Sequence, residues 1–316
     1  MKKIKLVFFQ LIILFFALLL VELCLRIINS DMKNYDIEMW RYAKELKVQD
    51  SILGHIHLKE AASILQGVEV KLNSRGMRSE EFKKEDKKIL FLGSSISLGW
   101  GVEQTYSYPQ LIQEKIFSDS LEYKILNGSI GNYNTYRYIN NFLTNYTDIK
   151  PEIIVVNYFI NDVESLKNGK SNWFIKNLQL AATLNIALKK FLSKSGIDLK
   201  SYYKDLYDED NLSFLEMKNA LSKLSEYSSK TDTTILLTVI PDIHFLEDYP
   251  FEGIHEKMKS ISKEFGFEFH DQLPSLIGIP FIDLQIIKGD SHPNTFGHSI
   301  IAETLYPEIK RIITNK

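Results

Sequence analysis

The first pattern along the chain is an apolar run over residues 6–25, which only Gln10 and Glu22 interrupt. A helix needs about 20 apolar residues to span a bilayer, so the run predicts one transmembrane anchor over residues 1–30. A cleaved signal peptide would carry a shorter apolar segment and a small-x-small cleavage site. No small residue stands directly before Cys24, so a lipoprotein cleavage site also fits badly. We therefore expect an uncleaved anchor.

The residues that flank the run predict its orientation. Three lysines lie before it and are expected to stay in the cytoplasm, although Arg26 on the far side weakens the asymmetry. Everything after about residue 30 would then lie outside the cytoplasmic membrane. Residues 31–86 mix charged and aromatic positions and include a predicted turn at 73–78. We expect them to form a lead-in segment that packs on the following domain rather than folding alone.

From residue 87 onward, short apolar runs alternate with helical patterns. The predicted strands cover residues 89–92, 124–126, 153–159, 234–240 and 280–284. The predicted helices cover residues 106–117, a stretch that ends near 142, and 294–313. Nearly continuous apolar strands separated by helices indicate a parallel sheet that is covered on both faces. The sequence therefore predicts an α/β domain over residues 87–316.

One segment interrupts this alternation. Residues 165–215 hold an amphipathic stretch at 173–192, followed by several tyrosines among charged residues. We expect an insertion at the rim of the site, where connections tolerate additions and carry specificity. The amphipathic stretch is interpreted as a helix that packs on the core, with an interfacial or lid helix as the alternative.

Composition and charge exclude some classes of function. The 38 basic and 40 acidic residues nearly cancel, giving a formal net charge of −2. A nucleic-acid-binding protein would show a strong basic excess, so that class is excluded. Cys24 is the only cysteine, which excludes a disulfide framework and a cysteine metal cluster.

The predicted strands end in residues that can carry chemistry. Ser95 follows the first strand, Gly131 the second, Asn161 the third, and Asp290 and His292 the fifth. In an open parallel sheet, ligands bind outside the carboxyl ends of the strands. A serine becomes a nucleophile when a histidine takes its proton, and a carboxylate fixes the tautomer of that histidine. N–H donors must then meet the developing oxyanion. These residues predict acyl transfer without a metal or cofactor.

Other residues compete for these roles. Ser94 and Ser97 are alternative nucleophiles, and Asp283 is the alternative acid. His298 lies in the predicted last helix, where a structural role is expected.

Several of the same residues also have a plain structural interpretation. Gly131 could be an ordinary turn, and Asn161 could cap a helix, where asparagine is favoured. His244 follows the fourth strand and is expected to be solvated. A metal site formed by Asp242, His244 and His292 is conceivable, but no ligand spacing supports it.

These motifs resemble those of the SGNH (GDSL-type) hydrolase superfamily. The similarity lies in residues 89–97, Gly131, the Asn161-Asp162 pair and residues 290–294, in the family's order. It implies a flavodoxin-like three-layer α/β/α fold with a parallel sheet of about five strands. It also implies Ser95 as nucleophile, His292 as base and Asp290 as its partner. The oxyanion hole would come from Ser95, Gly131 and Asn161.

Three positions depart from the family pattern. Ser94 stands where the family usually has Asp, and Phe159 stands where it usually has Gly. The acid usually lies three residues before the histidine, where this chain has Gly289. Asp290 lies two residues before His292, a spacing that resembles a branch that acetylates exopolysaccharides.

The resemblance also suggests function and location. An anchor followed by a segment such as 73–78 is similar to bacterial envelope members, which implies a single-pass protein of the cytoplasmic membrane. We expect an ester hydrolase that acts on O-acyl groups of an envelope glycan or lipid. An O-acyltransferase of envelope polysaccharide is the first alternative, and a non-catalytic glycan-binding protein on a degenerate fold is the second. A metallohydrolase is a further class. The oligomeric state is left open.

Overall fold

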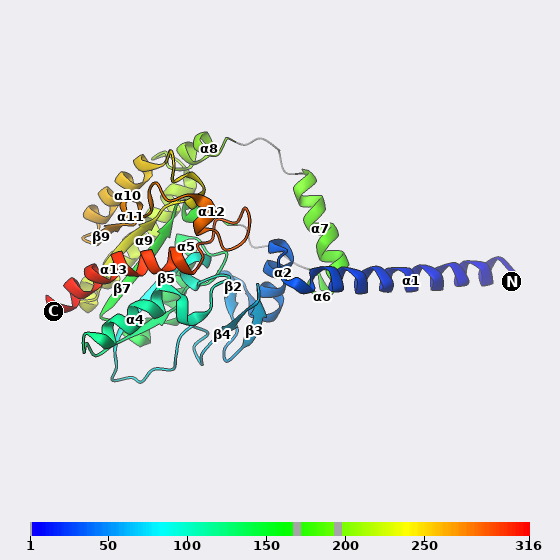
Figure 1. Ribbon diagram of the computed structural model, residues 1–316, viewed down its shortest axis with the longest axis horizontal. Coiled ribbons are helices and arrows are strands. Elements are labelled where there is room, and N and C mark those ends of the chain that lie inside the picture. The colour runs from blue at the N-terminus through cyan, green and yellow to red at the C-terminus, as the bar shows by residue number, and fades with distance from the viewer. Residues whose placement is uncertain (1, 167–171, 193–197) are drawn as a thin grey trace.

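A five-stranded parallel sheet forms the centre of the computed structural model, which describes residues 2–166, 172–192 and 198–316 (Figure 1). The strand order is β6-β5-β7-β8-β9, with all neighbours parallel. The strands are β5 (Lys87–Gly93), β6 (Tyr123–Asn127), β7 (Ile153–Phe159), β8 (Thr234–Ile240) and β9 (Glu268–Asp271). Strand β7 is buried along its whole length because its aliphatic and aromatic side chains are covered on both faces.

Helices cover both faces of this sheet. On one face α4 packs against α13, and on the other α5 packs against α9, while α10 covers β8 and β9. These helices are α4 (Tyr108–Ser118), α5 (Thr135–Asn145), α9 (Leu212–Thr231), α10 (Glu252–Glu264) and α13 (Thr295–Thr314). The expected three-layer α/β/α fold with a flavodoxin-like strand order is confirmed.

Short elements complete this domain. The α-helical ones are α3 (Ser95–Leu98), α8 (Leu199–Leu206), α11 (Leu273–Leu276) and α12 (Phe281–Leu284). The 3-10 turns are η2 (Gln104–Tyr106), η3 (Thr147–Ile149), η4 (Ile160–Val163) and η5 (Ile243–Phe245).

The fifth strand was expected at residues 280–284, and that expectation is wrong. This segment forms the single-turn helix α12, in which Leu284 is buried and Ile282 is exposed. The fifth strand is β9, which reads Glu-Phe-His-Asp and pairs only with β8 at the edge of the sheet. Its residues are half-buried throughout, so the sequence contains no apolar run that would mark it.

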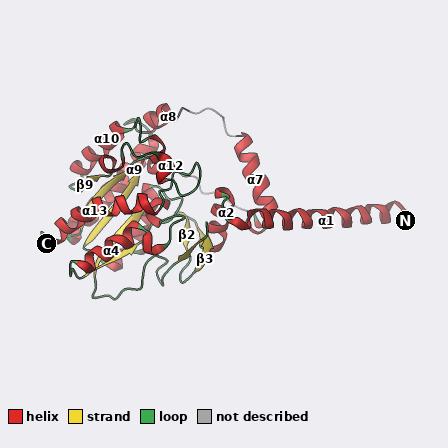
Figure 2. Ribbon diagram, in the orientation of Figure 1, coloured by secondary structure: helices red, strands yellow, loops and turns green. Residues whose placement is uncertain are grey.

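The lead-in segment forms a helix and two antiparallel hairpins outside the main sheet (Figure 2). Its elements are η1 (Asn29–Asp31), α2 (Tyr35–Glu45), β1 (Lys47–Asp50), β2 (Gly54–His57), β3 (Ala62–Leu65) and β4 (Val68–Lys71). Five of its apolar side chains, including Tyr42, form a cluster with Leu98 and Trp100 of the main domain. The segment is therefore packed onto the chain that directly follows Ser95.

Helix α1 (Lys2–Ile28) projects away from the rest of the protein (Figure 1). It is long and apolar enough to cross a membrane, and the span that meets this test is not buried by other described residues. The expected amphipathic stretch forms α6 (Trp173–Asn177) and α7 (Gln179–Leu192). These two helices pack against α2, and α7 also packs against α1, rather than against the core around the sheet.

Candidate active site

Ser95, His292 and Asp290 meet at the carboxyl edge of the sheet. The Oγ of Ser95 lies 2.7 Å from Nε2 of His292. The other ring nitrogen of His292, Nδ1, lies 2.5 Å from Oδ1 of Asp290. Because a carboxylate only accepts, Nδ1 carries the hydrogen of a neutral imidazole, and Nε2 is left to accept the hydroxyl hydrogen of Ser95. A base is thus in contact with a nucleophile.

The local chain geometry places Ser95 at the start of a helix. Strand β5 ends at Gly93, and Ser95 is the first residue of α3. A Cβ on Gly93 would lie 2.5 Å from Oγ of Ser97 and 3.0 Å from the main-chain oxygen of Asn157, so only glycine fits there. The first N–H groups of a helix have no partner within it. The N–H of Ser95 therefore suits an oxyanion formed beside its own side chain.

Arg78 of the lead-in segment holds the turn that follows α3. Its guanidinium group donates to the main-chain oxygens of Leu98, Gly99 and Val102, at 2.6 to 3.0 Å. It also donates to the main-chain oxygen of Glu69 in β4. One buried side chain thus ties the turn after Ser95 to the lead-in segment. The sequence analysis placed Arg78 only in a turn.

The loop that carries Asp290 and His292 is closed at its base. Gln285 and Pro293 form an isolated antiparallel bridge, and the N–H of Ile286 donates to the main-chain oxygen of His292. Gly289 has a φ of +81°, a conformation that suits glycine. An aspartate at position 289 would be strained, which gives a physical reason for the acid to stand at 290 instead.

Asp290 is held as a carboxylate although it is buried. Burial alone raises its pKa, but the hydrogen bonds from His292 and the electrostatic attraction to that residue outweigh this, and the side chain of Gln66 contributes, so that the pKa is below its ordinary value. Oδ1 also accepts the main-chain N–H of His292 at 3.0 Å. A charged partner beside Nδ1 stabilises the imidazolium that forms when His292 takes a proton.

The three expected oxyanion donors are not equivalent. Asn161 lies within η4, after β7, where its side chain is exposed and makes no hydrogen bond among the described residues. It is not the N-cap of that turn, which is Phe159. Gly131, in contrast, is buried, and its N–H donates to the hydroxyl of Tyr42 at 3.0 Å. Of the three expected donors, the main-chain N–H of Ser95 and the side-chain amide of Asn161 therefore remain available to an oxyanion in this structure.

Tyr42 links Gly131 to a buried histidine. The hydroxyl of Tyr42 lies 2.6 Å from Nε2 of His57, whose Nδ1 lies 2.9 Å from the main-chain oxygen of Gly76. Burial lowers the pKa of His57 to about 3, so its ring is neutral. Nδ1 must donate to the carbonyl, Nε2 accepts from Tyr42, and the Tyr42 oxygen accepts from Gly131. Each polar atom in this series of hydrogen bonds has a partner.

Ser94 and Phe159 each fit their surroundings. Burial raises the pKa of Asp162 well above its ordinary value, against hydrogen bonds from the N–H of Phe159 and from Ser94 that lower it. An aspartate at position 94 would add a second carboxyl group beside Asp162, whereas serine adds a donor. Phe159 has an extended backbone, with a φ of −117°, which does not require glycine. Neither departure disrupts the arrangement around Ser95.

An aromatic wall beside His292 was missed by the sequence analysis. The ring of Tyr35 lies 5.9 Å from the imidazole ring of His292 and 6.5 Å from the ring of Trp100. Burial, and to a lesser degree the charge of Asp290, raise the pKa of Tyr35 to about 12, so its hydroxyl stays protonated. Tyr35 and Tyr42 are seven residues apart, which places them on one face of α2. That seven-residue spacing is the feature of the sequence from which the two tyrosines could have been predicted to face the same side.

The residues that compete for the catalytic roles lie elsewhere: two are buried in hydrogen bonds with Tyr108, and one is exposed. Ser97 is buried, and its Oγ accepts the hydroxyl of Tyr108 at 2.7 Å. His298 is buried, and its Nδ1 accepts the N–H of Tyr108. Asp283 is exposed on α12.

A second histidine–aspartate pair lies close to the loop that carries Asp290 and His292. Nδ1 of His244 lies 2.8 Å from Oδ1 of Asp242, and its Nε2 lies 3.5 Å from the main-chain oxygen of Gly289. His244 is exposed, as expected of a solvated side chain, although it also contacts Asp242. His292 pairs with Asp290 rather than with these residues, and the described residues contain no group of three side chains suited to a metal ion.

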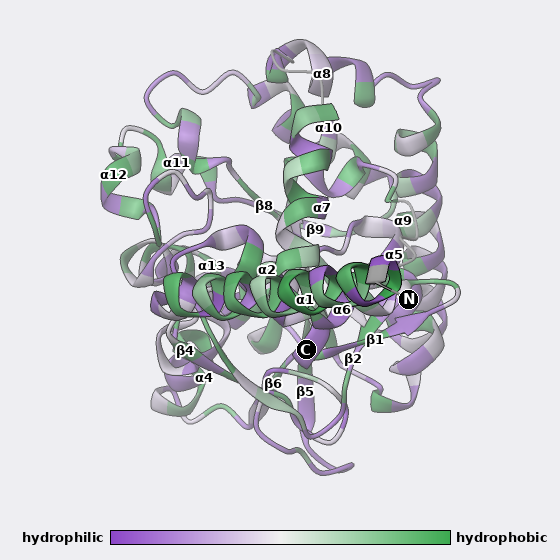
Figure 3. Ribbon diagram, turned by 90° about the vertical axis from the view of Figure 1, so that its right-hand side faces the viewer, coloured by the Kyte–Doolittle hydropathy of each residue, from purple (hydrophilic) through white to green (hydrophobic). Residues whose placement is uncertain are grey.

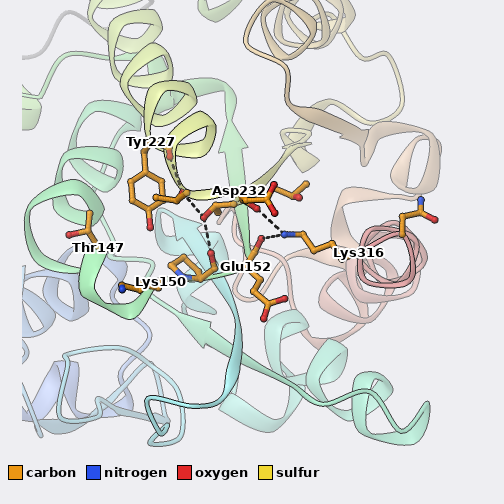
Figure 4. A pocket seen from close by; sticks show the side chains of 11 residues that line it. Thr147, Lys150, Glu152, Tyr227, Asp232 and Lys316 are labelled. Atoms are coloured by element: carbon orange, nitrogen blue, oxygen red, sulfur yellow. Dashed lines mark hydrogen bonds between the residues drawn. The ribbon is translucent and has the colours of Figure 1, made fainter.

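A pocket of about 740 Å³ lies at the opposite edge of the sheet (Figure 4). It is lined by residues that precede β7 and β8, and Nζ of Lys316 donates to the main-chain oxygens of Glu152 and Asp232 there. Because ligands of open parallel sheets bind at the carboxyl edge, this pocket is not the candidate site.

Comparisons with known proteins complete this description. No protein-family model matches the chain, and no curated protein sequence matches it. Among solved structures, it is similar to Axe2, an acetyl xylan esterase from Geobacillus stearothermophilus, at 18% identity and a TM-score of 0.48 over 72% of this chain and 97% of that one. It is also similar to esterase EstA from Pseudoalteromonas sp., at 17% identity and a TM-score of 0.45 over 72% of this chain and 100% of that one. The similarity to TesA has 14% identity and a TM-score of 0.47 over 71% of this chain and 99% of that one. Similarities of this size do not establish a substrate.

Proposed function

We propose that this protein is a serine-dependent ester hydrolase of the SGNH type. The observation that carries the proposal is the continuous hydrogen-bonded series Ser95–His292–Asp290. In the first step Oγ of Ser95 attacks the acyl carbon while its proton passes to Nε2 of His292. The carbonyl oxygen becomes an oxyanion that accepts from the Ser95 N–H and the Asn161 amide. Collapse expels the alcohol, which takes the proton from His292, and leaves an acyl-enzyme.

The second step reverses these roles. Water attacks the acyl carbon, and His292 takes its proton. The second oxyanion uses the same two donors, and its collapse frees the acid and restores the proton to Ser95. Asp290 keeps its charge throughout and stabilises the imidazolium in both steps. The reaction needs no further group.

We assign an O-acyl group on an envelope glycan or lipid as the substrate class. The apolar helix α1 supports this assignment, because it ends at Ile28 and the aromatic wall beside His292 begins at Tyr35. A domain tethered by the six residues between Ile28 and Tyr35 works on esters close to the bilayer. An acyltransferase would form the same acyl-enzyme and would differ only in that a sugar hydroxyl replaces water. The spacing of Asp290 and His292 is what favours this second candidate.

The experiment uses the full chain in detergent micelles with an aryl acetate, in the presence and absence of an oligosaccharide acceptor, and with a fluorophosphonate probe. Ser95→Ala should lose both hydrolysis and labelling, while Ser299→Ala, at a half-buried serine of α13 whose hydroxyl bonds the main-chain oxygen of Phe296, should keep both. Labelling of neither the wild type nor the variants would favour a non-catalytic glycan-binding protein. Loss of activity to a chelator, with Ser95→Ala still active, would point to a metallohydrolase. Acetylated oligosaccharide formed at the expense of free acetate would identify a transferase.

A further inference from the structure

The apolar helix α1 and the helix pair α6–α7 are joined at one point. The carboxylate of Glu22 accepts the main-chain N–H groups of Gln179 and Leu180, at 3.0 and 2.7 Å. Arg26 pairs with Glu22 and donates to the main-chain oxygen of Asn177. The first N–H groups of a helix lack partners within it, so Glu22 completes the start of α7. This contact gives a reason for an acidic residue in an otherwise apolar helix.

The position of Glu22 along α1 fixes the level of this junction. Residues 4–21 are apolar apart from Lys5 and Gln10, and at 1.5 Å per residue they extend about 27 Å. The hydrocarbon core of a bilayer is about 30 Å thick. If α1 spans the bilayer, Glu22 and Arg26 lie where it leaves the hydrocarbon. The start of α7 is then at the membrane surface.

Helix α7 has an apolar stripe that nothing described covers. Leu184, Ala187, Leu188, Phe191 and Leu192 recur at intervals of three and four residues and are all exposed, Phe191 to 85%. At about 100° per residue these positions form one face. Figure 3 shows the hydrophobic colouring of α7 and of α1 in the same view.

The opposite face of α7 is the one that packs on the protein. Gln179 and Ala182 are buried, and Ile186 lies on the same side. That side meets α1 and α2, and Lys190 pairs with Asp36 at the start of α2. The stripe therefore faces away from α2 and from the main domain. In Figure 1, α7 leaves the end of α1 across the direction of α1 rather than along it.

The neighbouring helix α6 adds two aromatic side chains. Trp173 and Phe174 are exposed to 65% and 61%, although Nε1 of Trp40 in α2 bonds the main chain of α6 at Ile175. Tryptophan is enriched at membrane–water interfaces, where its ring sits at the level of the headgroups. An amphipathic helix with such a flank lies in the interface with its apolar face in the acyl boundary.

We propose that the apolar stripe of α7, with Trp173 and Phe174, rests in the surface of the same bilayer that α1 spans. The partner is the lipid bilayer, because a spanning α1 leaves the start of α7 at its surface. A second contact besides α1 fixes the orientation of the domain. The hydroxyl of Ser95 is then held at a constant height above the membrane. The proposal rests on the membrane anchor and not on the hydrolase activity, so either can fail without the other.

The test measures membrane depth at single sites. The full chain carries Cys24→Ser and one introduced cysteine that bears a nitroxide label, and it is reconstituted in nanodiscs of phosphatidylethanolamine and phosphatidylglycerol. Phe191→Cys reports on the stripe and Leu14→Cys on the middle of α1. Phe117→Cys is the matched control, an exposed phenylalanine at the end of α4 on the far side of the sheet. Collision rates with oxygen, which enters lipid, and with a water-soluble nickel complex are compared.

The expected ratio of oxygen to nickel collisions at residue 191 exceeds that at residue 117 and approaches that at residue 14. A ratio at 191 equal to that at 117, with 14 in lipid, overturns the proposal and leaves the anchor intact. Protection of 191 from both reagents, with broadening that disappears when unlabelled protein is added, shows a second copy on the stripe and also overturns it. A label at 14 that is open to nickel removes the anchor itself. Because the ring of Phe191 is so exposed, its replacement removes little packing.

Discussion

The hydroxyl of Tyr42 accepts the main-chain N–H of Gly131 at 3.0 Å. This contact places a side chain of the lead-in segment on a loop at the carboxyl edge of the sheet. The Gly131 N–H, which was expected to donate to the oxyanion, donates to Tyr42 instead. A Cβ at position 131 would lie 2.7 Å from the Tyr42 ring, so the close approach depends on glycine. The glycine serves packing here.

Removal of the Tyr42 hydroxyl should cost stability more than catalysis. Tyr42→Phe leaves the Gly131 N–H and Nε2 of His57 buried without partners, at about 1–3 kcal/mol each. We expect the free energy of unfolding to fall by about 2–6 kcal/mol, with kcat lowered by less than about tenfold. Thermal denaturation in micelles measures the first and aryl acetate hydrolysis the second. Tyr146→Phe is the control, since its hydroxyl bonds one half-buried carbonyl. A kcat loss as large as that of Asn161→Ala would return Gly131 to the oxyanion hole.

Asn161 should behave in the opposite way. Its exposed side chain makes no hydrogen bond among the described residues, so Asn161→Ala should leave the melting temperature unchanged. Loss of one oxyanion donor lowers kcat by about 10²–10³-fold. Asn161→Asp should lower it further, because a carboxylate repels the oxyanion. An unchanged kcat in Asn161→Ala would exclude this amide from the reaction.

Asp290 and Asp283 provide a matched pair of substitutions. Asp290→Asn removes the charge that stabilises the His292 imidazolium and allows the wrong tautomer, so kcat should fall by about 10⁴-fold. Asp283→Asn alters an exposed side chain on α12 and should leave kcat unchanged. Steady-state hydrolysis by both variants separates the two acids. Equal losses would mean that the acid was wrongly assigned.

Stability should fall in mild acid because His57 is buried as a neutral ring. Its folded pKa of about 3 lies below the unfolded value of about 6.5, so the unfolded state binds more protons below pH about 6.5. The contribution of His57 is complete above that pH and is lost as the pH falls toward 3. At pH about 5 the loss is about 2 kcal/mol.

The measurement for His57 compares unfolding at pH about 7.5 and about 5. His57→Gln keeps a donor for Gly76 and an acceptor for Tyr42 but cannot titrate, so its stability should change less between the two conditions. His55 and His298, whose pKa values burial lowers to about 2 and about 3, still titrate in this variant. An identical pH dependence in the variant and the wild type would contradict the prediction.

The strands that sequence predicted best are those that are buried along their length. The expected ranges 153–159 and 234–240 coincide with β7 and β8, whose apolar runs reflect cover on both faces. The edge strand β9 has half-buried residues and no such run, and so it was missed. The proline-led segment at 280–284 has an apolar composition but forms a helical turn.

For the site, sequence located the residues that follow strands and missed those that come from elsewhere. Ser95 and Asn161 lie at the ends of β5 and β7, where a rule for parallel sheets places ligands. Tyr35, Tyr42 and Arg78 reach the site from the lead-in segment through packing between distant parts of the chain. Local pattern carries no direct signal of such contacts, apart from the seven-residue spacing on α2.

The four carbonyl contacts of Arg78 determine where the protein could be cut and still work. A protease acting between residues 29 and 34 would cut the direct covalent link to α1 and leave Tyr35, Tyr42 and Arg78 with the main domain, which would then depend on α6 and α7 for its place at the membrane. A protease acting between residues 80 and 86 would leave all three attached to the turn after Ser95 by packing and hydrogen bonds alone. Cleavage at the first place should preserve activity, and cleavage at the second should make it depend on those non-covalent contacts.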